Sequence, residues 1–148
     1  MKPVVKKATP AAIAVLRQAT ALFPKRKKLS DGLLPSAAHQ KQNPNSDHNT
    51  GLAVDLTDDP ANGVDCHLIF EKLKTDNRVK YLIFSGKIWS AKNGETKYDG
   101  INQHHKHLHI SIKDGCGNDT SPWFPWMGKP KAIAKVKANI PKPLPKKQ

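Results

Sequence analysis

Two short segments, 51–57 and 107–112, alternate strictly between apolar residues and polar or small ones. The apolar positions are Leu52, Val54, Leu56, Leu108, Ile110 and Ile112. Because neighbouring side chains of a strand point to opposite faces, this period of two predicts two half-buried strands. If the strands pair with their polar faces together, Asp55, His107 and His109 come to one surface of a sheet.

His48 lies just upstream of the first segment, after the turn-like stretch Asn43–Ser46, and can fold back over that surface. Histidine and aspartate are ligands of Zn²⁺, and three protein ligands leave a fourth position open for water. Such an open site is catalytic rather than structural, because the bound water becomes a nucleophile near neutral pH. The sequence therefore predicts a split metal site that draws on His48, Asp55, His107 and His109.

The remaining pattern predicts an α+β fold, a small antiparallel sheet with helices packed on one side, in a single domain. Residues 10–22 and 65–75 have apolar positions at helical spacing, and Pro10 suits a first helical turn. Segments 81–84 and 87–90 flank Ser85-Gly86 and indicate a hairpin, with Trp89 in the core. Residues 95–99 are expected to form a solvated loop.

The other histidines and the cysteines carry no comparable pattern. His39, His67 and His105 are expected to be exposed or hydrogen-bonded surface residues. Cys66 and Cys116 are expected to be reduced thiols, although a disulfide between them stays open at this stage.

The motif Ser46-x-His48-x-x-Gly51-x-Ala53-x-Asp55, followed by His107-x-His109, resembles the D-alanyl-D-alanine carboxypeptidase and endopeptidase superfamily. This superfamily includes the lysostaphin-type peptidases and the zinc domain of hedgehog proteins. The chain looks closest to the small peptidase domains of bacteriophage endolysins, with further similar stretches at 30–32, 58–67 and 98–100. The resemblance covers residues 10–114.

The resemblance implies one Zn²⁺ per chain, held by His48, Asp55 and His109. It places His107 in the active site as a residue that does not bind the metal. His104 stands where many members carry a glutamate as general base, a departure that is similar to murein endopeptidases with histidines in that role. We therefore expect His104 and His107 to share the acid–base work, for which imidazole has a suitable pKa.

The implied activity is hydrolysis of an amide bond in the peptidoglycan stem peptide or cross-link through a metal-bound water. Which bond is cut stays open between D-Ala–D-Ala, L-Ala–D-Glu and D-Ala–diaminopimelate. Ser46 either hydrogen-bonds the substrate or caps its own turn.

Charge is the second strong signal, because the formal net charge is +13 and no acidic residue precedes Asp31 or follows Asp119. We divide the chain into a basic segment (1–9), the peptidase domain (10–116), an aromatic and proline-rich strap (117–128) and a Lys/Pro-rich flexible tail (129–148). Trp123, Phe124 and Trp126 of the strap are expected to cover apolar surface. The positive charge of the tail predicts a weak attraction of the chain to an anionic wall or membrane surface.

The start of the chain has too short an apolar stretch for a signal peptide, and no segment predicts a membrane span. We expect a monomer that is made in the host cytoplasm and acts on the bacterial cell wall. The alternative function is a basic nucleic-acid-binding protein or a metal-dependent nuclease. No recognised nucleic-acid-binding motif is present, so we expect no specific nucleic-acid partner.

Overall fold

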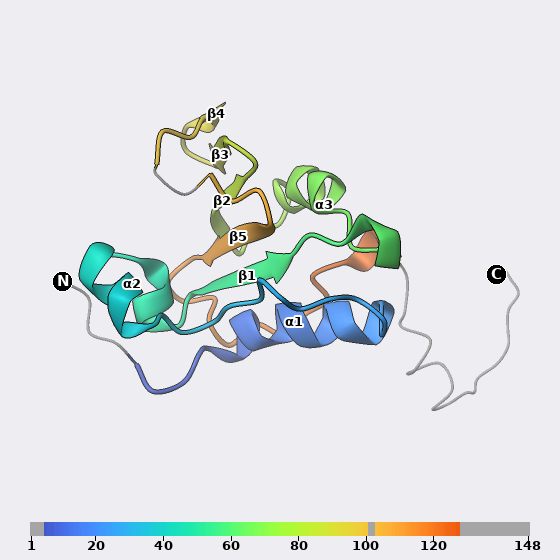
Figure 1. The fold of residues 1–148 in the computed structure, drawn as a ribbon, viewed down its shortest axis with the longest axis horizontal. Coiled ribbons are helices and arrows are strands. Elements are labelled where there is room, and N and C mark those ends of the chain that lie inside the picture. The colour runs from blue at the N-terminus through green and yellow to red at the C-terminus, as the bar shows by residue number, and fades with distance from the viewer. Residues whose placement is uncertain (1–4, 101–102, 128–148) are drawn as a thin grey trace, which may run out of the picture.

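The structure is a computed structural model, and it describes residues 5–100 and 103–127 of the chain. Figure 1 shows a curved sheet with one long helix running beside it. The helices are α1 (Pro10–Leu22), α2 (Ala37–Gln42) and α3 (Cys66–Leu73). The strands are β1 (Ala53–Thr57), β2 (Val79–Phe84), β3 (Lys87–Ser90), β4 (Gly94–Lys97) and β5 (His107–Ile112). Three short 3₁₀ turns, η1 (Asp47–Thr50), η2 (Pro60–Asn62) and η3 (Pro125–Met127), complete the described elements.

The sheet has the strand order β1-β5-β2-β3-β4, and every neighbouring pair is antiparallel. The two strands that alternation predicts therefore lie side by side, although about fifty residues separate them in sequence. The ends of both strands lie within two residues of the predicted ends. The predicted hairpin is also present and consists of β2 and β3. The predicted α+β class and the single small domain are confirmed.

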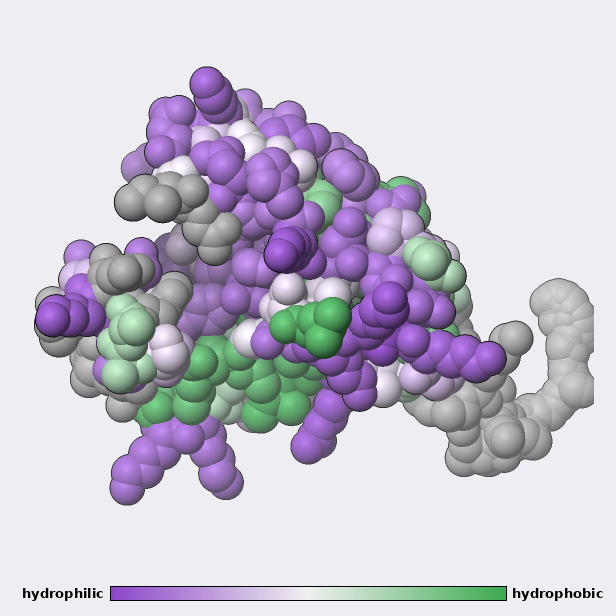
Figure 2. Space-filling model, viewed as in Figure 1, coloured by the Kyte–Doolittle hydropathy of each residue, from purple (hydrophilic) through white to green (hydrophobic). Residues whose placement is uncertain are grey.

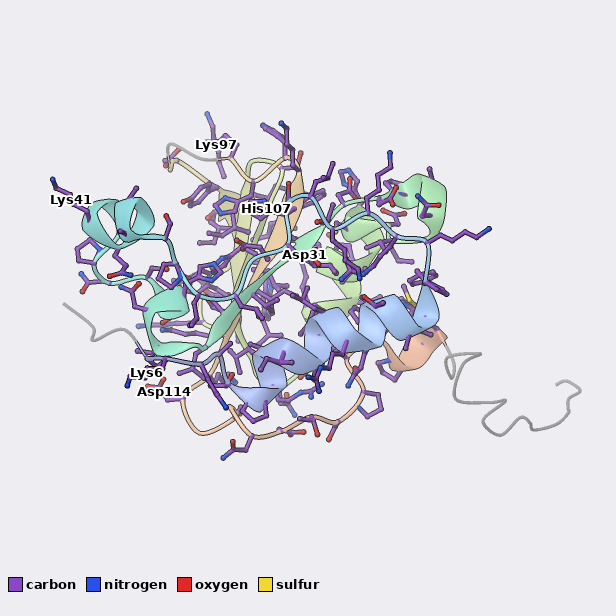
Figure 3. All side chains as sticks on the ribbon, turned by 60° about the horizontal axis from the view of Figure 1, so that its bottom comes forward. Lys6, Asp31, Lys41, Lys97, His107 and Asp114 are labelled. Atoms are coloured by element: carbon purple, nitrogen blue, oxygen red, sulfur yellow. The ribbon has the colours of Figure 1, made fainter. Side chains whose placement is uncertain are left out.

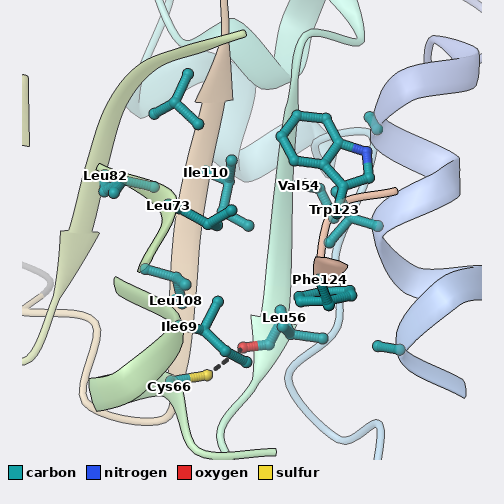
Figure 4. Close-up of a cluster of buried hydrophobic side chains, with 14 of the residues drawn as sticks. Val54, Leu56, Cys66, Ile69, Leu73, Leu82, Leu108, Ile110, Trp123 and Phe124 are labelled. Atoms are coloured by element: carbon teal, nitrogen blue, oxygen red, sulfur yellow. Dashed lines mark hydrogen bonds between the residues drawn. The ribbon is translucent and has the colours of Figure 1, made fainter. Parts of the chain in front are cut away.

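Apolar side chains of β1, β5 and β2 meet α1 and α3 on one face of the sheet (Figure 4). Val54, Leu108 and Ile110 are fully buried there. The helices begin where the sequence provides caps, because Thr9 accepts a hydrogen bond from the Ala12 amide and Asp65 from the His67 amide. With both long helices on one face, the polar positions of the strands are left on the other.

The strap covers apolar surface as expected, and Trp123 is fully buried. Its indole N–H donates to the Ala11 carbonyl at 3.1 Å, and the guanidinium of Arg78 stacks 3.6 Å from the ring centroid. Phe124 is also buried, whereas Trp126 is only partly covered. The strap therefore completes the core beneath α1.

Two details of the prediction are wrong. Residues 94–97 form strand β4 instead of a solvated loop, because a tight turn after Ser90 lets them pair with β3. All four residues are exposed, so no alternation marked them as a strand. Trp89 is only partly buried and packs at the margin of the core.

Cys66 and Cys116 are both free, as expected, and burial raises the pKa of the Cys66 thiol. Within the described residues no helix is long and apolar enough to cross a membrane. The tail (129–148) lies outside the described residues, as do positions 1–4 of the basic segment.

Candidate metal centre

The short turn η1 contains His48 and places it at the polar face of the sheet. The Ser46 hydroxyl caps this turn by accepting a hydrogen bond from the His48 amide at 3.2 Å. Gly51 ends it with φ +73, and a Cβ there would stand only 3.0 Å from the Ala8 Cα atom. Only glycine suits this position, because the backbone is left-handed and packs against residues 7–9, just before α1. The chain enters β1 directly afterwards.

Asp55 and His109 face each other across β1 and β5 as directly paired residues. His109 Nδ1 lies 3.2 Å from Asp55 Oδ1, and His48 Nε2 lies 3.3 Å from the same oxygen. The three side chains offer ligand atoms that all lie within 4.8 Å of one another. His48 and His109 are buried, and Asp55 is half-buried.

This donor set fits a transition metal. Two ligands that each stand about 2.0–2.1 Å from a tetrahedral ion are separated by about 3.3 Å, close to both nitrogen–oxygen distances. The two imidazoles and one carboxylate also match the open sites in which three protein ligands leave a position for water. His48, Asp55 and His109 therefore form a group that could bind a metal ion.

The Leu33 carbonyl fixes the orientation of His48, since it accepts from His48 Nδ1 at 2.7 Å. Residues 31–33 lie beside β1, where Gly32 and Asp55 exchange backbone hydrogen bonds of 2.8 and 3.1 Å. A Cβ on Gly32 would stand 3.1 Å from an Asp55 carboxylate oxygen. The segment before α2 thus closes one side of the site.

A β-bulge places Tyr81 on the other side. Ser111 and Ile112 are adjacent in β5, but Lys80 lies between their partners Tyr81 and Val79 in β2. Val79 therefore stays in the core, whereas the Tyr81 ring stacks on His109 with centroids 5.4 Å apart. Simple alternation along β2 would have put both residues on one face.

His107 and His104 complete the group of imidazoles. His107 Nε2 lies 3.7 Å from Asp55 Oδ2, and the ring of His104 stands 5.0 Å from that of His107 and 5.7 Å from that of His109. His104 has a left-handed backbone with φ +58, and its carbonyl accepts from the Ser85 amide at the tip of the β2–β3 hairpin. The structure thus brings together all five residues that the sequence singles out for metal binding and catalysis.

The electrostatics of the group centre on Asp55. Burial acts to raise the pKa of this carboxyl, but hydrogen bonds from His109 and His48 outweigh it and hold the pKa far below its usual range. Burial likewise acts to lower the pKa of His48, yet the hydrogen bond and charge of Asp55 raise it above the ordinary value. Burial lowers the pKa of His107 although the Asp55 charge acts against it.

The site opens into a small pocket of about 180 Å³, whose lining includes His48, Asp55 and the segment Gly32–Ser36. Figure 2 shows a hydrophilic hollow between α2 and the β3–β4 hairpin. In Figure 3, His107 lies near the middle of the molecule, with Lys41 and Lys97 at its periphery. A polar ligand can therefore reach the metal group from this side.

Two of the remaining histidines lie apart from the group. His67 is exposed against the Phe84 ring, and His105 is exposed with its Nδ1 3.1 Å from the Ser85 hydroxyl. The side chain of His39 is outside the described part of the structure. Ser46 performs the capping role, while a role in substrate binding stays a prediction.

Sequence reasoning missed Leu33, Tyr81 and Ser111, which hold the ligands in place. Ser111 shares the strand face of His109 by simple parity, so alternation was a signal that could have found it. The bulge hides Tyr81, and a backbone carbonyl such as that of Leu33 leaves no trace in side-chain patterns.

Comparison of the chain with protein-family models, with curated proteins and with solved structures finds no match.

Proposed function

We propose that the chain is a zinc-dependent peptidoglycan peptidase that hydrolyses an amide bond in the murein stem peptide or cross-link. The observation that carries this proposal is the grouping of His48, Asp55 and His109 with two further imidazoles on the open side of the sheet. The motif resemblance to endolysin peptidase domains supplies the substrate class. The positive charge of the chain suits the anionic polymers of a bacterial wall.

His48, Asp55 and His109 would hold the ion. A bound Zn²⁺ supplies a Lewis acid for the scissile carbonyl and a water of lowered pKa. His107 and His104, whose rings are in edge contact, together take up a proton during attack and return one to the leaving amine. In its cationic form either imidazole also stabilises negative charge on the carbonyl oxygen.

Zymography on peptidoglycan and on DNA, each with and without a chelator, tests the proposal. We expect clearing of peptidoglycan alone, its loss on chelation and its return with added zinc. His48→Ala should abolish clearing, and the matched control His67→Ala should retain it, because His67 is exposed outside the metal group. Mass spectrometry of the released muropeptides then identifies the bond that is cut. Clearing of the DNA gel alone would contradict the proposal and favour a metal-dependent nuclease.

A further inference from the structure

Ser85 and His104 are the only non-glycine residues with a positive φ in the part of the chain that the structure describes. Their φ angles are +48 and +58, and such left-handed backbone persists in residues with a Cβ only where the surroundings hold it in place. The two residues hold each other, because the Ser85 amide donates to the His104 carbonyl at 3.0 Å. A residue with a proposed acid–base role is thus tied to the tip of the β2–β3 hairpin.

The hairpin tip is the two-residue turn Ser85-Gly86 between β2 and β3. Both of its residues have a positive φ, as in the turn that matches the twist of a β-hairpin. Their amides donate to two successive carbonyls, Ser85 to His104 and Gly86 to Gln103, each at 3.0 Å. We call these two hydrogen bonds the backbone clamp.

Three further contacts surround the backbone clamp. The Ser85 hydroxyl lies 3.1 Å from His105 Nδ1, and the Gly86 carbonyl accepts from the Tyr98 amide at 2.9 Å. The Tyr98 ring in turn packs edge-on against the His104 ring, with centroids 5.6 Å apart. The backbone of His104 is therefore held by the hairpin tip, and its ring is held by a tyrosine that the same tip binds.

We propose that Ser85 and Gly86 are positioning residues, whose amides hold the backbone of His104 and so direct its imidazole toward His107. Because two dihedral angles set the backbone of a residue, fixing the carbonyl of His104 at the tip also fixes the direction of its side chain. The His104 ring centroid lies 5.0 Å from that of His107 and 5.7 Å from that of His109. This inference rests on the proposed function for the role of His104 in proton transfer.

Gly86→Ala is the variant that disturbs the backbone clamp. A Cβ at this position would stand 3.2 Å from Gln103 Oε1, and the φ of +80 suits glycine alone. Ser85→Gly is the matched control, because glycine keeps the amide donor and adopts left-handed backbone without strain. The control removes only the hydroxyl contact to His105.

Steady-state hydrolysis of a soluble muropeptide by the full-length, zinc-loaded chain tests the proposal. We expect Gly86→Ala to lower kcat by about 10²-fold, the effect of a small displacement of a reacting group, and to leave KM and zinc affinity unchanged. Ser85→Gly should retain the wild-type kcat. A loss of zinc affinity in Gly86→Ala together with kcat would show that the tip supports the whole fold, and would overturn the proposal. A folded Gly86→Ala variant with the wild-type kcat would overturn it as well.

Amide hydrogen exchange of the wild-type chain, followed by NMR, tests the backbone clamp without any activity and stays valid if Gly86→Ala does not fold. We expect the Ser85 and Gly86 amides to be protected from exchange, and nuclear Overhauser contacts between the His104 and His107 rings. Fast exchange of both amides would overturn the clamp. Protected amides in a chain that leaves peptidoglycan intact would instead refute the proposed function and leave the clamp standing.

Discussion

At the scale of single residues, the five histidine and aspartate side chains at the site are not equivalent. Among these five, only His48, Asp55 and His109 have ligand atoms close enough to surround one ion. His107 instead lies 3.7 Å from Asp55 Oδ2, whereas His48 and His109 both contact Oδ1. Under the proposed function, this arrangement would separate metal binding from proton transfer. The separation can be tested with single substitutions.

We expect His107→Ala to keep zinc affinity within a few-fold of wild type and to lower hydrolysis by about 10²- to 10⁴-fold, the usual contribution of an acid–base group. His109→Ala should instead lose zinc binding, and hydrolysis with it. Chelator competition and muropeptide digestion measure the two properties on the same preparations. An equal loss of zinc in both variants would show His107 to be a ligand.

At the scale of elements, the segment before α2 is held in place by a buried ion pair. Arg26 is 5% exposed and places two guanidinium nitrogens on Asp31, at 3.1 and 2.8 Å. Asp31 also accepts from the amide and hydroxyl of Thr57 at the end of β1. Arg26 also donates to the Thr20 hydroxyl and the Leu16 carbonyl of α1, so the pair joins that helix, this segment and the strand that carries Asp55.

Replacing Asp31 by asparagine should lower the free energy of unfolding by about 3 kcal/mol near pH 7, because it leaves a buried guanidinium without its counter-charge. Burial acts to raise the pKa of Asp31, but hydrogen bonds from Arg26 and Thr57 outweigh it and lower the pKa. The stabilisation is thus present above the unfolded-state pKa, near 3.8, and is lost as pH falls through the lower folded-state pKa.

Urea unfolding of both proteins with chelator present, from pH 7 down to about pH 3, measures this difference. The difference in the free energy of unfolding between wild type and Asp31→Asn should be constant above about pH 5 and become smaller below about pH 4. Asp114→Asn, at an exposed position, should stay within about 0.5 kcal/mol of wild type. If the difference in unfolding free energy is the same at every pH, the charge of Asp31 does not cause it.

Elements with a buried face could be predicted because burial imposes a period on the sequence. This holds for α1, α3, β1 and β5, and the same parity placed Asp55, His107 and His109 on one surface. β4 has no buried face, so its residues carry no pattern of this kind. The bulge before Tyr81 depends on how two strands pair, which local periodicity does not record.

At the scale of the whole molecule, positive charge is concentrated in the last twenty residues of the sequence. Positions 129–148 contain seven lysines and no acidic residue, more than half of the net charge of +13. Coulombic attraction to an anionic polymer needs no defined structure in such a segment. It does need low ionic strength, because the Debye length falls from about 10 Å at 0.1 M salt to about 3 Å at 1 M.

We therefore expect the full-length chain with these seven lysines changed to glutamine to sediment less with purified cell walls at low salt. The difference should vanish near 1 M salt, where wild-type binding is also screened. Hydrolysis of a small soluble muropeptide should be equal in the two proteins at every salt concentration, since these substitutions leave the metal group intact. Wall binding that differs equally at low and high salt would mean that the tail recognises the wall through contacts other than charge.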